Sequence, residues 1–315
     1  MEKFTSKEAG KAPVKMIWMF ITLGLTVSVF LFFVSVAGSR FGMLFQNVIW
    51  STVPILLLAG SAGICLSRGT LNLALPGTAL LAAAVYSQVA VNSGSVGAAL
   101  FAALGAGAAM GAVNGIFAIQ SGRKALLVTA VASLVLGALF TSIGTQILDG
   151  RIVNVQHDRS VYRTMGVIFL LLAVQACVLS GLGRNASTNR GEDRNAPTAG
   201  GRFMWTFAAG ILAALAGAYT VARVNAVSPA TFNSHNETVI LPALLLAGAM
   251  IPNARKSRGE GVCGGIALVL GCLCLGFVVL MFSYFSIEVN VQRIIILLAC
   301  IALLIPNILI RRGSA

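Results

Sequence analysis

Long apolar runs, separated by short polar segments, follow one another along almost the whole chain. Most are close to the ~20 residues that a helix needs to cross a bilayer, and none shows the ~10-residue alternation of a membrane β-strand. This pattern predicts an all-α, polytopic membrane helix bundle of about ten transmembrane helices. The predicted spans are residues 16–38, 48–67, 71–92, 96–120, 125–149, 165–183, 203–224, 239–252, 261–285 and 292–310.

These runs also divide the chain. Residues 1–15 are a basic leader, 16–310 the transmembrane domain and 311–315 a short tail. A basic leader is also found in signal peptides, but the first apolar run is longer than their apolar core, which favours a retained helix. The eighth span amounts to only ~21 Å of helix, short of a ~30 Å hydrocarbon core. It either starts earlier, near Phe232, or is a tilted or half-length helix.

The composition agrees with a membrane protein. Hydrophobic residues make up 57% of the 315 and charged residues 10%, whereas a soluble domain carries about a quarter charged residues. A net charge of +13 is by itself typical of nucleic-acid or lipid binding. Its distribution instead follows the positive-inside rule when both termini are cytoplasmic, so we expect a bilayer and no nucleic acid as partner. The basic residues then left outside are Arg40, Arg151, Arg159, Arg163, Arg223 and Arg293.

The predicted spans hold no ionisable side chain at membrane depth. The nine acidic residues and two histidines lie in loops or at span ends. Ion-coupled transporters usually carry such residues inside the membrane, which argues against that class, although backbone carbonyls at a broken helix also bind sodium. A phosphate-cradling loop, a nucleophile–base pair and a metal cluster are missing from the sequence too. We therefore expect no enzyme and no metal or cofactor bound by this chain.

Small residues recur four positions apart in three spans. Such faces let helix backbones approach closely in lipid, so each glycine is better explained by packing than by pore lining. The six cysteines are interpreted as packing residues as well. The predicted packing glycines are Gly107, Gly111 and Gly115 in the fourth span, Gly210 and Gly217 in the seventh, and Gly261 and Gly265 in the ninth.

Between the second and third spans the chain reads RGTLNLALPG, residues 68–77. Gly69, Pro76 and Gly77 let the chain leave a helix at this point. In a packed, re-entrant segment Asn72 bonds backbone groups that lipid would leave unpaired. In the alternative, a tight turn, the same Asn caps the third helix.

Three blocks of the chain resemble the permease subunits of ABC importers in the ribose-type group. That group includes nucleoside and riboflavin permeases and is related to branched-chain amino acid permeases. The likeness runs in order from about residue 50 to 305 and depends on the order and spacing of the blocks. The blocks are GAAMGAVNGIFAIQSGRKALLVTA, TFAAGILAALAGAYTVARVNAVSPATF and LLLAGAMIPNARKSRGEGVCGGIALVLG.

The segment 68–77 also resembles this group. It aligns without gaps to a nucleoside-type turn, Gly-x-x-Asn-Ile-Gly-x-Glu-Gly, through Gly69, Asn72 and Gly77, while Ala74 and Pro76 depart from it. The later segment ARVNAVSPATF is closer to the ribose type, and the inner segments 184–202 and 253–260 depart from both. The resemblance therefore implies a small polar solute, either a sugar such as ribose or a nucleoside or riboflavin.

The resemblance implies partners. Two permease subunits, identical or different, would share a central path, with cytoplasmic ABC ATPases that bind ATP and Mg below and an extracytoplasmic solute-binding protein outside. The location would be a bacterial inner (cytoplasmic) membrane. Arg255, Lys256 and Arg258 are the candidates for ATPase docking, although the positive-inside rule explains their charge equally well.

Polar residues near helix breaks and span ends are the candidates for lining the path. They are Asn72, Asn114 and Asn225, each also explained by a structural role, and Arg223, which either faces an outer vestibule or snorkels to the interface. Two other classes stay open: an ion-coupled secondary transporter, and a structural membrane subunit of a larger complex.

The charge distribution makes a testable prediction about topology. A reporter fused to the N-terminus, and one inserted in the segment 253–260, should both give a cytoplasmic signal, because the inner segments carry most of the Lys and Arg. A reporter inserted near residue 94 serves as the control and should give an extracytoplasmic signal. An N-terminus on the outer side would contradict the whole assignment.

Overall fold

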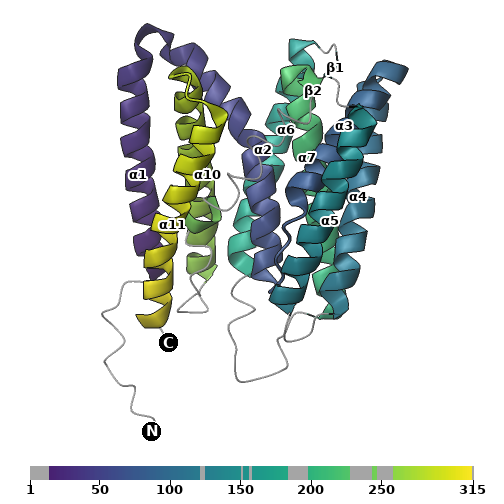
Figure 1. Ribbon diagram of the computed structural model, residues 1–315. Helices are drawn as coiled ribbons and strands as arrows, with labels where there is room; N and C mark the ends of the chain where they lie inside the picture. The colour runs from purple at the N-terminus through teal and green to yellow at the C-terminus, as the bar shows by residue number, and fades with distance from the viewer. Residues whose placement is uncertain are drawn as a thin grey trace.

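The structure, a computed structural model, describes residues 14–120, 125–149, 152–155, 158–183, 198–227, 243–246 and 258–313. These residues form a bundle of long helices that run up and down between two ends (Figure 1). The helices are α1 (Val14–Ala37), η2 (Gly38–Arg40), α2 (Phe41–Ser67), α3 (Leu75–Ser93), α4 (Val96–Gln120), α5 (Ala125–Leu148), α6 (Arg159–Gly183), α7 (Ala199–Val224), α10 (Arg258–Tyr284) and α11 (Val289–Gly313).

Each predicted span except the eighth coincides with a helix in the described part of the chain. The largest differences are at the starts of α2 and α6, which begin at Phe41 and Arg159 instead of residues 48 and 165. Of the eighth span only 243–246 is described, and it is helical. The remainder of that span lies outside the described residues.

Within the described residues, six helical stretches are long and apolar enough to cross a membrane. The first of them contains both α1 and α2, which Figure 1 shows running in opposite directions. The fold is thus that of an apolar helical bundle, and the count of about ten crossings stays a prediction. The stretches are Trp18–Ser67, Val96–Ile119, Leu127–Leu148, Ser160–Leu182, Ala199–Val224 and Gly261–Tyr284.

The two ends of the bundle differ. The start of α1 and the end of α11 lie at the same end, which we call the termini end (Figure 1). At the opposite end, the strand end, two short strands pair antiparallel, β1 (Val153–Asn154) with β2 (Ala226–Val227). This pairing, which joins the α5–α6 connection to the chain after α7, has no signal in the apolar pattern because it involves so few residues.

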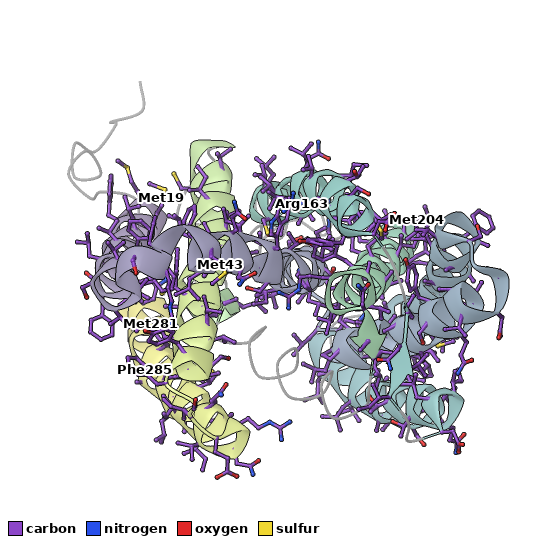
Figure 2. The ribbon with its side chains drawn as sticks, turned by 90° about the horizontal axis from the view of Figure 1, so that it is seen from above. Met19, Met43, Arg163, Met204, Met281 and Phe285 are labelled. Atoms are coloured by element: carbon purple, nitrogen blue, oxygen red, sulfur yellow. The ribbon has the colours of Figure 1, made fainter. Side chains whose placement is uncertain are left out.

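Seen from above, the helices form two groups (Figure 2). One contains α1, α10 and α11, and the other contains α3, α4, α5 and α7. Helices α2 and α6 connect the groups, because α2 packs against both α7 and α10, and α6 packs against α2 and α10. The largest buried apolar cluster spans α2, α3, α6 and α7, so the core sits in and beside the second group.

Close backbone contact holds α4 against α7. A Cβ at Gly111 would lie 2.7 Å from the Phe207 carbonyl oxygen, and one at Gly115 would lie 2.6 Å from the Phe203 ring. A Cβ at Gly107 would overlap Ala214. Helices that gain no hydrophobic driving force in lipid associate through such dispersion contacts between small residues.

The other predicted packing glycines also lie where helices meet. A Cβ at Gly217 of α7 would overlap the Ala79 carbonyl of α3. Gly265 of α10 faces the Val178 backbone of α6, with its Cβ position only 2.7 Å from the Val178 Cα. A residue that the sequence analysis did not single out, Gly181 of α6, faces the Gly261 carbonyl across the same interface.

Phenylalanines fill the first hairpin near the strand end. The Phe30 ring lies 5.5 Å from the Phe277 ring of α10 and 6.0 Å from the Phe41 ring of α2, both edge-to-face. Phe33 and Phe45 join the same cluster. Aromatic pairs in this arrangement add stability beyond the area they bury, so the cluster fixes α1 and the start of α2 on α10.

A matched pair of glycines on α4 tests the packing of α4 on α7. Gly107→Ala should destabilise the protein by about 1–3 kcal/mol, because the added methyl forces the two helices apart. Gly105→Ala should have little effect, since a Cβ at Gly105 meets nothing within 4 Å. Thermal unfolding of the purified protein measures both. Equal unfolding temperatures for the two variants would show that α4 and α7 do not pack in this way.

Candidate functional site

The segment between α2 and α3 leaves helical structure at the termini end. Gly69, at φ +74°, follows the last turn of α2. Its N–H donates to the Leu66 carbonyl at 3.1 Å, and the Thr70 N–H donates to the Cys65 carbonyl at 3.1 Å. These two bonds form a Schellman motif, in which a left-handed glycine ends a helix while its last carbonyls stay paired.

The next residues, 70–74, form neither helix nor strand and lie along α5; we call them the extended segment, although its last residue, Ala74, the N-cap of α3, has helical backbone angles. The Leu71 N–H donates to Thr129 Oγ1 at 3.0 Å, and the Leu73 N–H donates to Ser133 Oγ at 2.8 Å. The single hydrogen of Ser133 Oγ is within reach of two carbonyls, that of Leu71 at 3.2 Å and that of Ala130 in its own helix at 3.1 Å. Alternate residues of an extended chain are ~6.6 Å apart and residues four apart on a helix ~6 Å, so two hydroxyls on α5 match two backbone donors.

This extended segment enters the bundle to a considerable depth. A Cβ at Gly137 of α5 would lie 3.1 Å from the Ala74 Cα, and Gly137 is about 18 Å along α5 from Ala125 at 1.5 Å per residue. The predicted third span, 71–92, becomes helical only at Leu75. The N–H groups of Leu71 and Leu73, just before it, are instead bonded to hydroxyls of α5.

Helix α3 then begins against α5. Asn72 Oδ1 accepts the Ala74 N–H at 3.0 Å, which pairs one donor just before the helix. Pro76 occupies the first turn of α3, where its missing N–H has no helical partner to lose. A Cβ at Gly77 would overlap the Gly137 carbonyl, so Gly77 is the residue that lets α3 approach α5 at the break.

Two of the path candidates meet beside this break. Asn72, from the extended segment, and Asn114, from α4, are each 5% exposed and line one small cavity. We call it the amide cavity, and its volume is about 10 Å³. Its other polar lining residues are Thr70, Thr129, Ser133 and Thr206.

The amide cavity presents hydrogen-bond donors. The Nδ2 atoms of Asn72 and Asn114 are buried and make no hydrogen bond within the described part of the protein. The thiol of Cys65 lies beside Asn72, Thr70 and Thr206. Two unbonded amide donors beside one cavity can bind a small group that accepts hydrogen bonds.

The other two path candidates lie at the strand end. Asn225 ends α7 in a left-handed conformation, and its carbonyl accepts the Val155 N–H at 2.9 Å. It lines an open pocket of about 720 Å³ that also includes Asn154 and Asp158. Thr206 and Asn225 are both on α7, separated by roughly 28 Å at 1.5 Å per residue, so the four candidates form no single site.

Arg223 does not reach freely into water. It is half-buried, and its buried Nε makes no hydrogen bond to the residues that the structure describes. Its charge interacts with the tyrosines Tyr219 and Tyr162. Arg223 therefore lies between the two positions considered from the sequence: it is half-buried near the strand end, close enough to Tyr219 and Tyr162 for their charges to interact.

Most of the proposed ATPase-docking residues lie outside the described part of the chain. Arg255 and Lys256 lie outside the described residues, and Arg258 is the first residue of α10. At the termini end the structure instead shows one basic contact, in which the Arg68 guanidinium lies over the Trp205 ring, 5.0 Å from its centroid. This cation–π contact ties the end of α2 to α7.

The sequence analysis did not identify the residues of α5 that bind the non-helical segment between α2 and α3. Thr129 and Ser133 lie in a strongly apolar run, where hydroxyls are usually interpreted as residues bonded within their own helix. Their spacing of four places both on one face of α5, and that is the signal that could have found them. Thr206 had no such signal, since only the packing of α7 brings it to the amide cavity.

Among protein-family models, curated proteins and solved structures, none matches this chain. The geometry itself establishes that the chain between α2 and α3 is non-helical and is bound by the hydroxyls of Thr129 and Ser133. A small cavity lined by two unbonded amide groups lies beside it.

The bonds to α5 make a prediction for Ser133. Ser133→Ala should destabilise the protein by about 1–3 kcal/mol, because it leaves the partly buried Leu73 N–H without the Ser133 hydroxyl. Ser87→Ala is the matched control, since the Ser87 hydroxyl is also buried but donates only to Ala84 of its own helix. The two unfolding temperatures give the comparison. An equal loss in both would mean that Ser133 does not hold the extended segment.

Proposed function

We propose that this chain is the membrane-spanning permease subunit of an ATP-driven ABC importer for a small polar solute. The observation that carries the proposal is the segment 68–77. It is the segment that resembles the turn of nucleoside-type permeases, and it is also where the chain leaves helix inside the bundle. The ordered likeness of the three longer blocks supports the same family.

The sequence adds support by what it lacks. It contains no phosphate-cradling loop of its own, so an ATPase partner would supply ATP hydrolysis and bind the ATP and Mg. A second permease subunit, identical or different, would complete the path, and an outer solute-binding protein would provide affinity. Such an assembly belongs in the inner membrane of a bacterium.

The proposed mechanism is a shift between two populated states. ATP binding favours closure of the ATPases, and their docking to the inner segments transmits this preference to the helices. The path needs to hold solute only weakly, because the binding protein outside provides the affinity. A bundle whose predicted spans carry no ionisable residue at membrane depth agrees with that division of labour.

The solute class follows from the resemblance alone. The turn at 68–77 favours a nucleoside or riboflavin, and the segment ARVNAVSPATF favours a sugar. All three solutes present hydroxyl groups, so a path with uncharged polar side chains suits each of them.

A second candidate is an ion-coupled transporter, because broken helices are where such proteins bind sodium. Hydroxyl oxygens line the amide cavity, but so do two amide groups whose Nδ2 donors make no hydrogen bond within the described residues, and such donors are unfavourable for a cation. That polarity favours the ATP-driven reading.

Reconstitution tests the proposal. Proteoliposomes are prepared with this chain, the ATPase and second subunit encoded beside it, and the binding protein. They should take up radiolabelled ribose, a nucleoside or riboflavin only when ATP is supplied on the side of the membrane that carries the ATPase. Replacing the phosphate-binding lysine of the ATPase should abolish uptake, as expected when hydrolysis drives transport.

Two controls separate the other classes. The chain alone, given a sodium or proton gradient, should take up none of the three solutes, and uptake under that condition would favour the secondary transporter. Omitting this chain from the complete mixture should abolish uptake. Full uptake without it would leave a structural role only.

A further inference from the structure

The amide cavity holds polar groups from four parts of the fold. Thr70 and Asn72 belong to the extended segment, Asn114 to α4, Thr129 and Ser133 to α5, and Thr206 to α7. None of these side chains carries a charge. The cavity therefore selects an occupant by hydrogen bonding and by size.

The hydrogen bonding requires an acceptor. Asn72 is oriented by its Oδ1, which accepts the Ala74 N–H at 3.0 Å, so its Nδ2 is the atom left for the cavity. The Nδ2 of Asn114 is likewise buried and unbonded in the described residues. Both amides line the same cavity, so a group that accepts from both would pair two donors that are otherwise unbonded in the described residues.

The cavity also offers acceptors to the same occupant. Thr206 Oγ1 donates to the Arg202 carbonyl at 2.9 Å, and Thr70 Oγ1 donates to the Cys65 carbonyl at 2.9 Å. Each hydroxyl has thus used its hydrogen and keeps a lone pair. An occupant with two hydrogens and two lone pairs would satisfy all four groups.

Size decides what the occupant is. The volume of the cavity is about 10 Å³, which is close to the ~10–15 Å³ that one buried water molecule needs. A sugar, nucleoside or flavin is far larger, and a cation would face two donors. We propose that the amide cavity binds one water molecule, which accepts hydrogen bonds from Asn72 and Asn114 and donates to the hydroxyls of Thr206 and Thr70.

Such a water would connect parts of the fold that make no direct bond here. Asn72 and Asn114 share no hydrogen bond within the described residues, so the water is what couples the extended segment to α4. The same water would join α7 to the break through Thr206. The proposed water site is independent of the proposed transport function, because it does not depend on which solute the protein moves.

A structure of the wild-type protein in lipid, at a resolution that shows ordered water, tests the proposal directly. The expected result is one density peak within hydrogen-bonding distance of both Nδ2 atoms. A well-ordered map with no peak there would overturn the proposal, as would an Asn114 amide turned to bond a protein oxygen.

A double-mutant cycle tests the coupling in solution. The loss of unfolding temperature in Asn72→Ala/Asn114→Ala should be smaller than the sum of the single losses by roughly 2–4 °C, since the first substitution already breaks the water bridge. Asn114→Ala combined with Ser87→Ala is the control pair and should be additive, because the Ser87 hydroxyl donates within α3, to the Ala84 carbonyl. Additivity of the Asn pair would show that no water joins them.

Discussion

Lipid offers no hydrogen bonds, and this constraint decides where the chain can leave helical structure. Non-helical backbone at membrane depth survives only where protein groups replace the lost helical partners. Here the replacement is a pair of hydroxyls on α5, Thr129 and Ser133, which pair with Leu71 and Leu73. The two bonds fit because the distance between alternate residues of an extended chain is nearly the distance between residues four apart on a helix. This match allows the break between α2 and α3.

The same constraint explains why glycines gather around the break. Hydroxyl-to-backbone bonds require the extended segment to lie directly on α5, and a side chain at Gly137 or Gly77 would hold the two apart. In turn, α3 lies against α7 through Gly217, and α7 lies against α4 through Gly210 and its partners. Small residues in lipid gain dispersion contacts and permit polar bonds, so packing and hydrogen bonding at this site depend on each other.

The sequence was informative where local chemistry decides the structure. Apolar runs located the helices α4 and α5 within a residue, and Gly69 and Pro76 marked the break, because each acts through its own backbone. The sequence could not show that Asn72 and Asn114 meet, since they are separated by α3 and come together only when α3, α4 and α7 pack. Nor did it show the pairing of β1 with β2, which depends on two short loops meeting at the strand end. Residues that act through distant contacts leave no periodic signal.

The polarity of the break bears on how this bundle would be driven. A helix interrupted at membrane depth can offer either carbonyl oxygens or N–H groups to its surroundings, and only the oxygens attract a cation. Here the Leu71 carbonyl is engaged by Ser133 and the Cys65 carbonyl by Thr70, while the two amide Nδ2 groups face the cavity. A coupling ion would have to displace these bonds and meet donors in return. A chain with such a break, and with no ionisable residue at membrane depth in its predicted spans, has little with which to use an ion gradient, and this agrees with the proposed ATPase partner.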